Sequence, residues 1–208
     1  TWSVTSSASN GGVNVDSNGL VTYVPVADFY GNDTFTVQVS DSELTDSITV
    51  SVTVNSVNDA PIIAEGASVT LEVNEDSSDS VTFTASDADG DPLTWSISSG
   101  AVEGIVTQTG SEFSYAPAAD FNGSDSFVVQ VSDGTATGIS TVNVTVIAVN
   151  DAPVVTSSPV TTANEYQVYA YDVAASDAEG DAVSYSLTNP PAGMVITSAG
   201  EIRWIPES

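Results

Sequence analysis

Several residue types are missing from this sequence, and each absence excludes a kind of chemistry. Cysteine is absent, so no disulfide framework holds the chain together. Histidine is absent too, which removes the usual general base and the usual transition-metal ligand. Arg203 is the single cationic side chain, so a crosslink between lysine and asparagine is excluded within this segment. The sequence shows neither a signal peptide nor a transmembrane run, and we expect any targeting signal to lie outside these residues.

The charge balance is strongly negative, because 28 acidic residues against one cation give a formal charge of −27. Such a field repels nucleic acid and anionic membrane surfaces, so we expect no nucleic-acid partner and no direct membrane insertion of this segment. It also opposes the folded state unless cations are recruited. Adaptation to a salty medium would spread carboxylates over every surface, whereas calcium binding would gather them at particular places. The clustering described below indicates that both operate.

The sequence repeats itself. The segment 28–41 returns with close similarity as 120–133, and Asn58-Asp59-Ala60-Pro61 returns as residues 150–153. The period, counted from Asn58 to Asn150, is 92 residues, which is too long for a solenoid unit and fits one small domain per repeat. We therefore expect tandem repeats in which both end copies are partial: the C-terminal part of one repeat at 1–59, a complete repeat at 60–151, and the N-terminal part of a third at 152–208.

The complete repeat has the pattern of an all-β domain. Its apolar residues alternate with a period of two, as in Phe127, Val129 and Val131, and no window has helical spacing. Trp95 shares a strand face with other apolar side chains, which favours a core position over a carbohydrate platform. Seven short strands in about 90 residues predict a Greek-key β-sandwich of immunoglobulin-like type. The expected strands, rich in β-branched and aromatic residues, are 69–73, 81–85, 93–97, 105–107, 112–115, 126–132 and 141–149.

Acidic and amide side chains recur where the repeats join. The pair Asn58-Asp59 is followed by the loop Asp87–Asp91, and Asn150-Asp151 is followed by the loop Asp177–Asp181 and a strand expected at 183–187. Carboxylates two residues apart in an irregular loop can converge on one hard cation, which needs about six to eight oxygens. Such loops also form turns without any metal. That alternative stays open for Asp28, Asp120 and the loop Asp87–Asp91, and we assign Asp33 and Asp125 to turns.

These motifs resemble the cadherin-like repeats of large bacterial surface proteins and adhesins. Residues 87–97 are similar to the acidic segment that leads into a strand in cadherins, and Val131-Ser132-Asp133 is similar to their late Ala-x-Asp segment. The two Asn-Asp pairs resemble the cadherin linker, and Glu75 resembles the early Glu of each domain. Residues 190–206 are similar to the dystroglycan-type variant of the repeat. The resemblance covers the whole chain and implies cadherin-like β-sandwich domains.

By this resemblance, Ca²⁺ would bind at both junctions and would be the only cofactor. One or two ions per junction are expected, because the carboxylate that cadherins place before the linker is Ser56 at the first junction and Ala148 at the second. The ligands implied at the first junction are Asp28, Asn58, Asp59, Asp87, Asp89 and Asp133. Those implied at the second are Glu75, Asp120, Asn150, Asp151, Asp177 and Glu179.

The resemblance further implies an extracellular or cell-surface location and a mechanical function. Calcium shared by neighbouring repeats would stiffen a stalk that holds an adhesive module. A polysaccharide-binding module with cell-surface or matrix glycans as partners is the alternative, and it needs a solvent-facing row of aromatics, for which Tyr166, Tyr169 and Tyr171 are candidates. Pairs of carboxylates can also support glycoside hydrolysis. An active site would occur once, however, whereas these carboxylates recur with the repeat, so we expect no enzyme.

Overall fold

The computed structural model describes residues 1–207, and Ser208, the last residue of the expected third repeat, lies outside them. Within residues 1–207 the chain forms strands, turns and loops and no helix, which confirms the all-β prediction. The chain groups into two compact units. The linker at 58–61 lies within the first unit and the linker at 150–153 within the second. The first unit holds 1–67, 83–98 and 129–140, and the second holds 68–82, 99–128 and 141–208.

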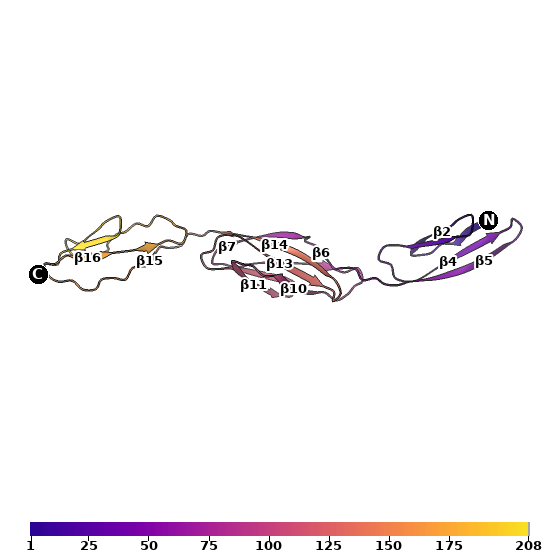
Figure 1. The fold of residues 1–208 in the computed structure, drawn as a ribbon, viewed down its shortest axis with the longest axis horizontal. Coiled ribbons are helices and arrows are strands. Elements are labelled where there is room, and N and C mark those ends of the chain that lie inside the picture. The colour runs from indigo at the N-terminus through magenta and orange to yellow at the C-terminus, as the bar shows by residue number, and fades with distance from the viewer. Residues whose placement is uncertain (208) are drawn as a thin grey trace. The chain divides into compact units, whose positions relative to one another are not determined.

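The first unit begins with five strands, drawn in indigo and purple in Figure 1. Tyr23 stacks on Phe35 with ring centroids 6.1 Å apart, and Phe35 and Val37 are buried. The alternating pattern Phe-x-Val therefore places one face of this sheet in the core, as a period of two requires. The strands are β1 (Trp2–Ser6), β4 (Gly31–Ser40) and β5 (Thr45–Val54) in one antiparallel sheet, and the hairpin β2 (Gly11–Val15) with β3 (Val21–Pro25).

The middle repeat has the two sheets of a β-sandwich. The inward side chains of β12 and β13 meet where Tyr115 stacks on Phe127, with ring centroids 6.3 Å apart, and both rings are buried. One sheet has the order β10 (Thr94–Ser99), β13 (Gly123–Ser132), β14 (Thr137–Ile147) and β7 (Ser68–Asn74). The other has the order β11 (Gly104–Thr109), β12 (Glu112–Pro117) and β8 (Asp79–Thr82), and β6 (Ile62–Ile63) pairs with β9 (Ala85–Ser86).

One pairing in the middle repeat is parallel. Strand β7 runs alongside β14 in register from Ser68 opposite Thr141 to Asn74 opposite Ile147. It lies at the outer edge of its sheet, and its inward residues Leu71 and Val73 are buried. This edge strand closes the sheet next to the acidic loop that follows it.

The expected strands are largely confirmed. The segment 81–85 is divided into β8 and β9, and β14 begins four residues earlier than expected and ends at Ile147. Trp95 is half-buried and packs against Phe83, with ring centroids 5.7 Å apart, so it contributes to the core without being enclosed by it.

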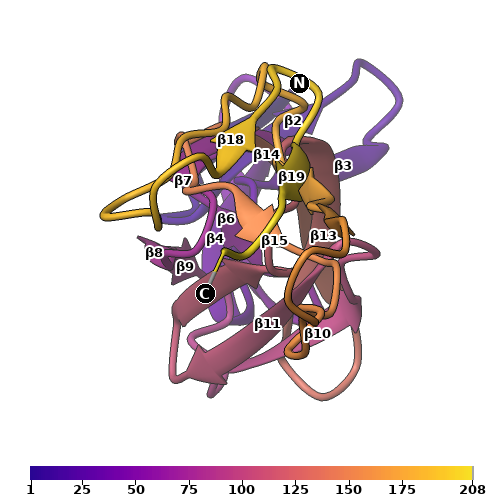
Figure 2. The ribbon, with the colours of Figure 1, turned by 90° about the vertical axis from the view of Figure 1, so that its left-hand side faces the viewer.

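The third repeat is represented by short strands in the second unit. The strand expected at 183–187 is wrong, since these residues are irregular. Its counterpart β10 is held by β13, and residues 1–207 contain no third-repeat counterpart of β13 to pair with it. Figure 2 shows β18 and β19 side by side, as their pairing requires. The strands are β15 (Val154–Val155) with β17 (Ala175–Ser176), and β16 (Tyr169–Asp172), β19 (Glu201–Trp204) and β18 (Val195–Ile196).

Asp33 and Asp125 are not turn residues, contrary to the sequence-based assignment. Asp125 lies in β13 and accepts hydrogen bonds from the N–H groups of Val102 (3.1 Å) and Glu103 (2.8 Å) and from the Tyr115 hydroxyl (3.1 Å). Asp33 makes the same contacts in the first unit, with Ser9, Asn10 and Tyr23. Each aspartate therefore anchors a loop more than 20 residues away in the sequence to the aromatic core.

The pKa values follow from this geometry. Burial works to raise the pKa of Asp125, but the N–H donors of Val102, Glu103 and Ser126 outweigh it and hold that pKa below its usual value. Burial, followed by the hydrogen bond to the Asp125 carboxylate, raises the pKa of Tyr115 to about 12. The carboxylate is therefore ionised and the phenol neutral at physiological pH.

Replacing this carboxylate tests its structural role. Asp125→Asn keeps the side-chain size but weakens three N–H···O contacts to a charged oxygen, and we expect the midpoint of thermal unfolding to fall by about 5 °C. Glu72→Gln, at an exposed position on β7, is the matched control. Tyr115→Phe should cost less, and the double variant should lose less than the two single losses added together. Circular dichroism melts measure this, and an unchanged midpoint for Asp125→Asn would contradict the anchoring role.

The same group sets a pH dependence. Because the folded-state pKa of Asp125 lies below its ordinary value of 3.8, its contribution to stability is fully present above pH 3.8 and is lost as the pH falls through the lowered pKa. We expect the difference in unfolding midpoint between the parent chain and Asp125→Asn to be constant between about pH 7 and pH 5 and to shrink below pH 3.8. A difference that persists undiminished at about pH 2 would contradict this assignment.

Candidate metal centres

The first acidic loop is built by Asp87. Its Oδ1 accepts hydrogen bonds from the N–H groups of Asp89 (3.0 Å) and Asp91 (3.2 Å), and Gly90 supplies the left-handed residue, with φ of 79°. One oxygen of Asp87 therefore has the turn-forming role that the sequence analysis left open as an alternative to metal binding. Its other oxygen, Oδ2, is buried and has no hydrogen-bond partner. Carboxylate oxygens of Asp87, Asp89 and Asp91 lie within 4.8 Å of one another.

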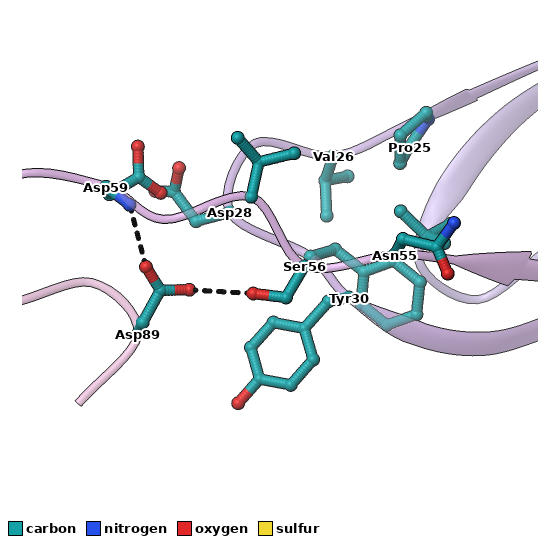
Figure 3. Close-up of a pocket in the computed structure, with 11 residues that line it drawn as sticks. Pro25, Val26, Asp28, Tyr30, Asn55, Ser56, Asp59 and Asp89 are labelled. Atoms are coloured by element: carbon teal, nitrogen blue, oxygen red, sulfur yellow. Dashed lines mark hydrogen bonds between the residues drawn. The ribbon is translucent and has the colours of Figure 1, made fainter. Parts of the chain in front are cut away.

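This loop contacts the linker that precedes it. Asp89 accepts hydrogen bonds from the N–H of Asp59 at 2.8 Å and from the hydroxyl of Ser56 at 3.3 Å, both dashed in Figure 3. Asn58 donates its side-chain amide to Asp133 Oδ2 at 2.9 Å and to the carbonyl of Asp59 at 2.8 Å. Five of the six residues implied at the first junction, Asn58, Asp59, Asp87, Asp89 and Asp133, are therefore linked in one hydrogen-bonded network.

Asp28 lies in the same region. It lines a hollow of about 220 Å³ together with Asp59 and Asp89, and Figure 3 shows the ring of Tyr30 at the same hollow. Its φ of 61° is a left-handed conformation, which costs free energy in a residue other than glycine and is better tolerated by Asp than by most. The structure thus places three carboxylates around one hollow, on the linker and on loops that precede and follow it.

The second acidic group, in the second unit, is more buried. Glu75 is only 2% exposed, and its carboxylate lies within 4.8 Å of those of Asp151 and Glu179. Glu75 Oε1 accepts a hydrogen bond from the N–H of Val149, and Glu179 Oε2 accepts one from the N–H of Asp151 at 3.0 Å. One oxygen of each carboxylate is buried and has no hydrogen-bond partner, namely Glu75 Oε2, Asp151 Oδ2 and Glu179 Oε1.

Asp151 also belongs to a second, exposed set. Its carboxylate lies within 4.8 Å of those of Asp76 and Asp120, and both of these residues have φ of 57°. Burial raises the pKa of Asp151, and the neighbouring charges of Glu179, Asp76, Asp120 and Glu75 raise it further. Asp151 is therefore shared by two carboxylate groups that repel one another in the absence of a cation.

The two linkers make equivalent hydrogen bonds to the acidic loops that follow them. The linker N–H of Asp59 binds Asp89, as that of Asp151 binds Glu179. Asn58 binds the Asp59 carbonyl at 2.8 Å, and Asn150 binds the Asp151 carbonyl at 2.9 Å. In the second loop Asp177 accepts the N–H of Asp181 at 3.0 Å, as Asp87 accepts that of Asp91, but Asp177 is not a member of the acidic groups within the described residues.

Sequence reasoning did not identify Asp76 or Asp91 as members of these groups. Asp76 directly follows Glu75, and its left-handed backbone turns it toward Asp120, whose N–H lies 3.5 Å from Asp76 Oδ1. The available signal was the Glu-Asp pair at the end of an expected strand. The cadherin resemblance implies a ligand role for Glu75 and not for Asp76.

The donor set fits a hard divalent cation. Carboxylate and carbonyl oxygens are the ligands of Ca²⁺, and a positive charge beside this group would compensate the three buried oxygens that have no hydrogen-bond partner. Arg203 cannot supply it, because it pairs with Asp172 at 2.7 Å and is the only cationic side chain of the sequence. At the second site Glu75, Asp151 and Glu179 would hold the ion, with Asp76 and Asp120 on the exposed side.

The tyrosines proposed for glycan binding do not form an exposed row. The hydroxyl of Tyr169 donates to the carbonyl of Val160 at 2.7 Å, and that of Tyr171 lies 2.7 Å from Ser157 Oγ. Both rings are half-buried, whereas Tyr166 is 66% exposed. Only Tyr166 of the three presents its ring to solvent as a platform would require.

Comparison with known proteins places the fold. A family model described as "Bacterial Ig domain" matches residues 1–53 and 58–146. The chain belongs to the bacterial Ig domain family. A second Ig-domain model matches residues 152–208, and the comparison with curated proteins gives no match. The tandem bacterial Ig-like repeats expected from the motifs are confirmed.

Solved cadherin structures share this fold. The crystal structure of mouse protocadherin-24 EC1-3 matches 98% of the chain and 78% of its own length, with 16% identity and a TM-score of 0.53. The protocadherin gammaB7 EC3-6 cis-dimer structure matches 99% of the chain, with 20% identity and a TM-score of 0.50, and the chain spans 60% of its length. At these identities the likeness concerns the fold alone.

An endo-fucoidan hydrolase, MfFcnA4 from glycoside hydrolase family 107, matches 100% of the chain with 20% identity and a TM-score of 0.41, and the chain spans 34% of its length. This match is too weak to carry an argument about activity.

Bacterial Ig-like and cadherin-like domains are typically extracellular, are generally non-catalytic and indicate an extender domain. Among residues 1–207 no helix is suited to crossing a membrane.

Neutralising one carboxylate separates repulsion from metal binding. In chelator, Asp151→Asn should raise the midpoint of thermal unfolding by about 4 °C, because it removes the charge that Glu75, Asp76, Asp120 and Glu179 all repel. In millimolar calcium the same variant should gain less from the ion than the parent chain does. Asp46→Asn, at an exposed position on β5, is the control and should change neither midpoint. Destabilisation of Asp151→Asn in chelator would show that the cluster is not under repulsion.

Proposed function

We propose that this chain is a calcium-stiffened extender segment of a large extracellular, cell-surface protein of adhesin type. Calcium would be held at the two Asn-Asp-Ala-Pro linkers, and the neighbouring repeats of the same chain are its proposed partners. The ligands proposed are those expected from the sequence, with Asp76 and Asp91 added.

One observation carries this proposal. Glu75, Asp151 and Glu179 come from the end of β7, from a linker and from the loop after β17, yet their carboxylates lie within 4.8 Å of one another. Each of them has a buried oxygen without a hydrogen-bond partner. A cation coordinated by all three would connect the middle repeat, the linker and the third repeat. Such a shared ion is what a calcium-dependent stiffener requires.

The mechanism follows from electrostatics. Without the ion, carboxylates on the two sides of the linker repel and favour open arrangements of residues 150–153. With the ion, the same charges become ligands, and the linker loses the freedom to bend. Because the ion binds the assembled site and not the unfolded chain, it also raises stability.

The affinity expected of such a site suits an extracellular location. Extracellular calcium modules bind with dissociation constants of about 10⁻⁴–10⁻³ M. A site in this range is filled outside cells and empty at cytosolic calcium levels. A stalk that stiffens after export would hold an adhesive module away from the surface, and cell-surface or matrix glycans are the partners proposed for such a module.

Spin labelling tests the stiffening directly. The chain has no cysteine, so Thr107→Cys and Ser198→Cys, at exposed positions in the middle and third repeats, place two labels across the second linker. We expect a narrow distance distribution in millimolar calcium and a broad one in chelator. The double variant Asp151→Asn/Glu179→Gln should remain broad in both.

The control pair is Thr107→Cys with Thr145→Cys, exposed positions within the middle repeat, whose mean distance should change little. Calcium binding is measured on the same samples by calorimetry. A distribution across the linker that stays broad while calcium binds would contradict stiffening. Absence of binding would contradict the metal site itself.

A further inference from the structure

Glu75 has a second set of contacts that concerns the fold of the middle repeat itself. It is the residue that follows β7, and its N–H donates to the carbonyl of Ile147 at 3.0 Å. Its Oε1 accepts the N–H of Val149. The backbone and the side chain of Glu75 therefore fasten the end of β7 to the end of β14 from two directions.

The strand that Glu75 fastens has few other attachments. Strand β7 is bonded to one neighbour only, β14, because it is the outermost strand of its sheet. The turn after it is tight, with Ser77 donating both its N–H (3.4 Å) and its hydroxyl (2.8 Å) to the Asn74 carbonyl. The parallel ladder ends at Asn74 and Ile147, so Glu75 closes it at the point where fraying would begin.

The stretch of β14 that pairs with β7 is deeply buried. Val142 is 0%, Val144 2% and Val146 4% exposed, and these residues lie opposite Val69, Leu71 and Val73 of β7. An opening of β7 would therefore leave this buried stretch of β14 at the edge of its sheet.

We propose that the ion at Glu75, Asp151 and Glu179 fastens β7 to β14, so that calcium controls the integrity of the middle repeat's sheet as well as the linker. This inference rests on the proposed calcium site. Glu75 Oε2 is buried without a partner, and the Glu75 carboxylate lies within 4.8 Å of two others, so without a cation the repulsion pulls on the residue that closes the ladder. With a cation bound, displacement of Glu75 would cost the ion a ligand, and opening of β7 becomes coupled to ion release.

Peptide-resolved hydrogen–deuterium exchange of the 208-residue chain tests the coupling. If β7 opens only when the ion leaves, calcium at ten times its dissociation constant should slow exchange in segments 69–75 and 142–149 about tenfold relative to chelator. Strand β5, residues 45–54, is the counterpart of β14 in the first repeat, is not part of this ladder and should change less than about twofold. The effect is thus expected on the ladder that Glu75 closes and not on its counterpart.

Two variants separate the fastening from the ion. Glu179→Gln removes a ligand and one repelling charge but leaves both Glu75 contacts, so its exchange in chelator should be no faster than that of the parent chain, and calcium should no longer slow it. Glu75→Gln keeps an oxygen for the Val149 N–H but loses the charge, so exchange should be insensitive to calcium at both segments. Faster exchange of Glu179→Gln in chelator would assign the effect to general destabilisation and overturn the coupling.

The two proposals fail differently. If calorimetry detects no calcium binding, the proposed function and this inference both fall. If calcium binds and narrows the distance distribution across the linker while segments 69–75 and 142–149 exchange at the chelator rate, stiffening stands and the fastening of β7 is overturned. If both respond and the Glu75→Gln variant loses both responses, one ion serves the linker and the sheet.

Discussion

The structure depends on how a chain with one cation accommodates 28 acidic side chains. Buried carboxylates are stable only when hydrogen-bond donors or a cation compensate for lost hydration. Asp125 meets this condition with three N–H groups and a phenol. Glu75, Asp151 and Glu179 each keep one buried oxygen without a hydrogen-bond partner. Backbone amides therefore compensate some carboxylates, and the proposed metal ion would compensate others.

This division explains why similar residues serve different purposes. Asp33 and Asp125 occupy equivalent strand positions and hold a distant loop to a tyrosine, which is half-buried for Tyr23 and buried for Tyr115. Asp28 and Asp120, five residues earlier in each repeat, have a left-handed backbone and present their carboxylates to the acidic groups. The repeat thus places a structural aspartate and a candidate ligand within one short segment, and the local backbone decides which is which.

The sequence was informative where the signal is local or periodic. Alternation of Phe127, Val129 and Val131 predicts a half-buried strand, because adjacent side chains of a strand point to opposite faces, and the 92-residue period predicts one domain per repeat. The acidic loops at 87–91 and 177–181 could be located because the spacing of their carboxylates recurs. The structure adds that carboxylates distant in the sequence, such as those of Glu75, Asp151 and Glu179, lie within 4.8 Å of one another.

Other features depend on contacts between distant residues, and local reasoning misplaced them. Asp125 was assigned to a turn because its donors, Val102 and Glu103, are more than 20 residues away. The parallel pairing of β7 with β14 joins segments about 70 residues apart, and no local pattern specifies it. The strand expected at 183–187 is irregular, since a strand also needs a neighbour to pair with.

The same contacts bear on the origin of the negative charge. Salt adaptation would act on carboxylates that are hydrated, such as those of Asp46 and Glu72, and would not place them in contact with one another. The groups around Asp151 differ, because burial and then the charges of four neighbouring carboxylates raise the pKa of Asp151 at a position where the linker, β7 and the third repeat meet. The proposed divalent cation would account for this arrangement, which is unfavourable for the protein alone, whereas the remaining exposed acidic residues suit a saline medium. The two explanations therefore apply to different carboxylates of the same chain.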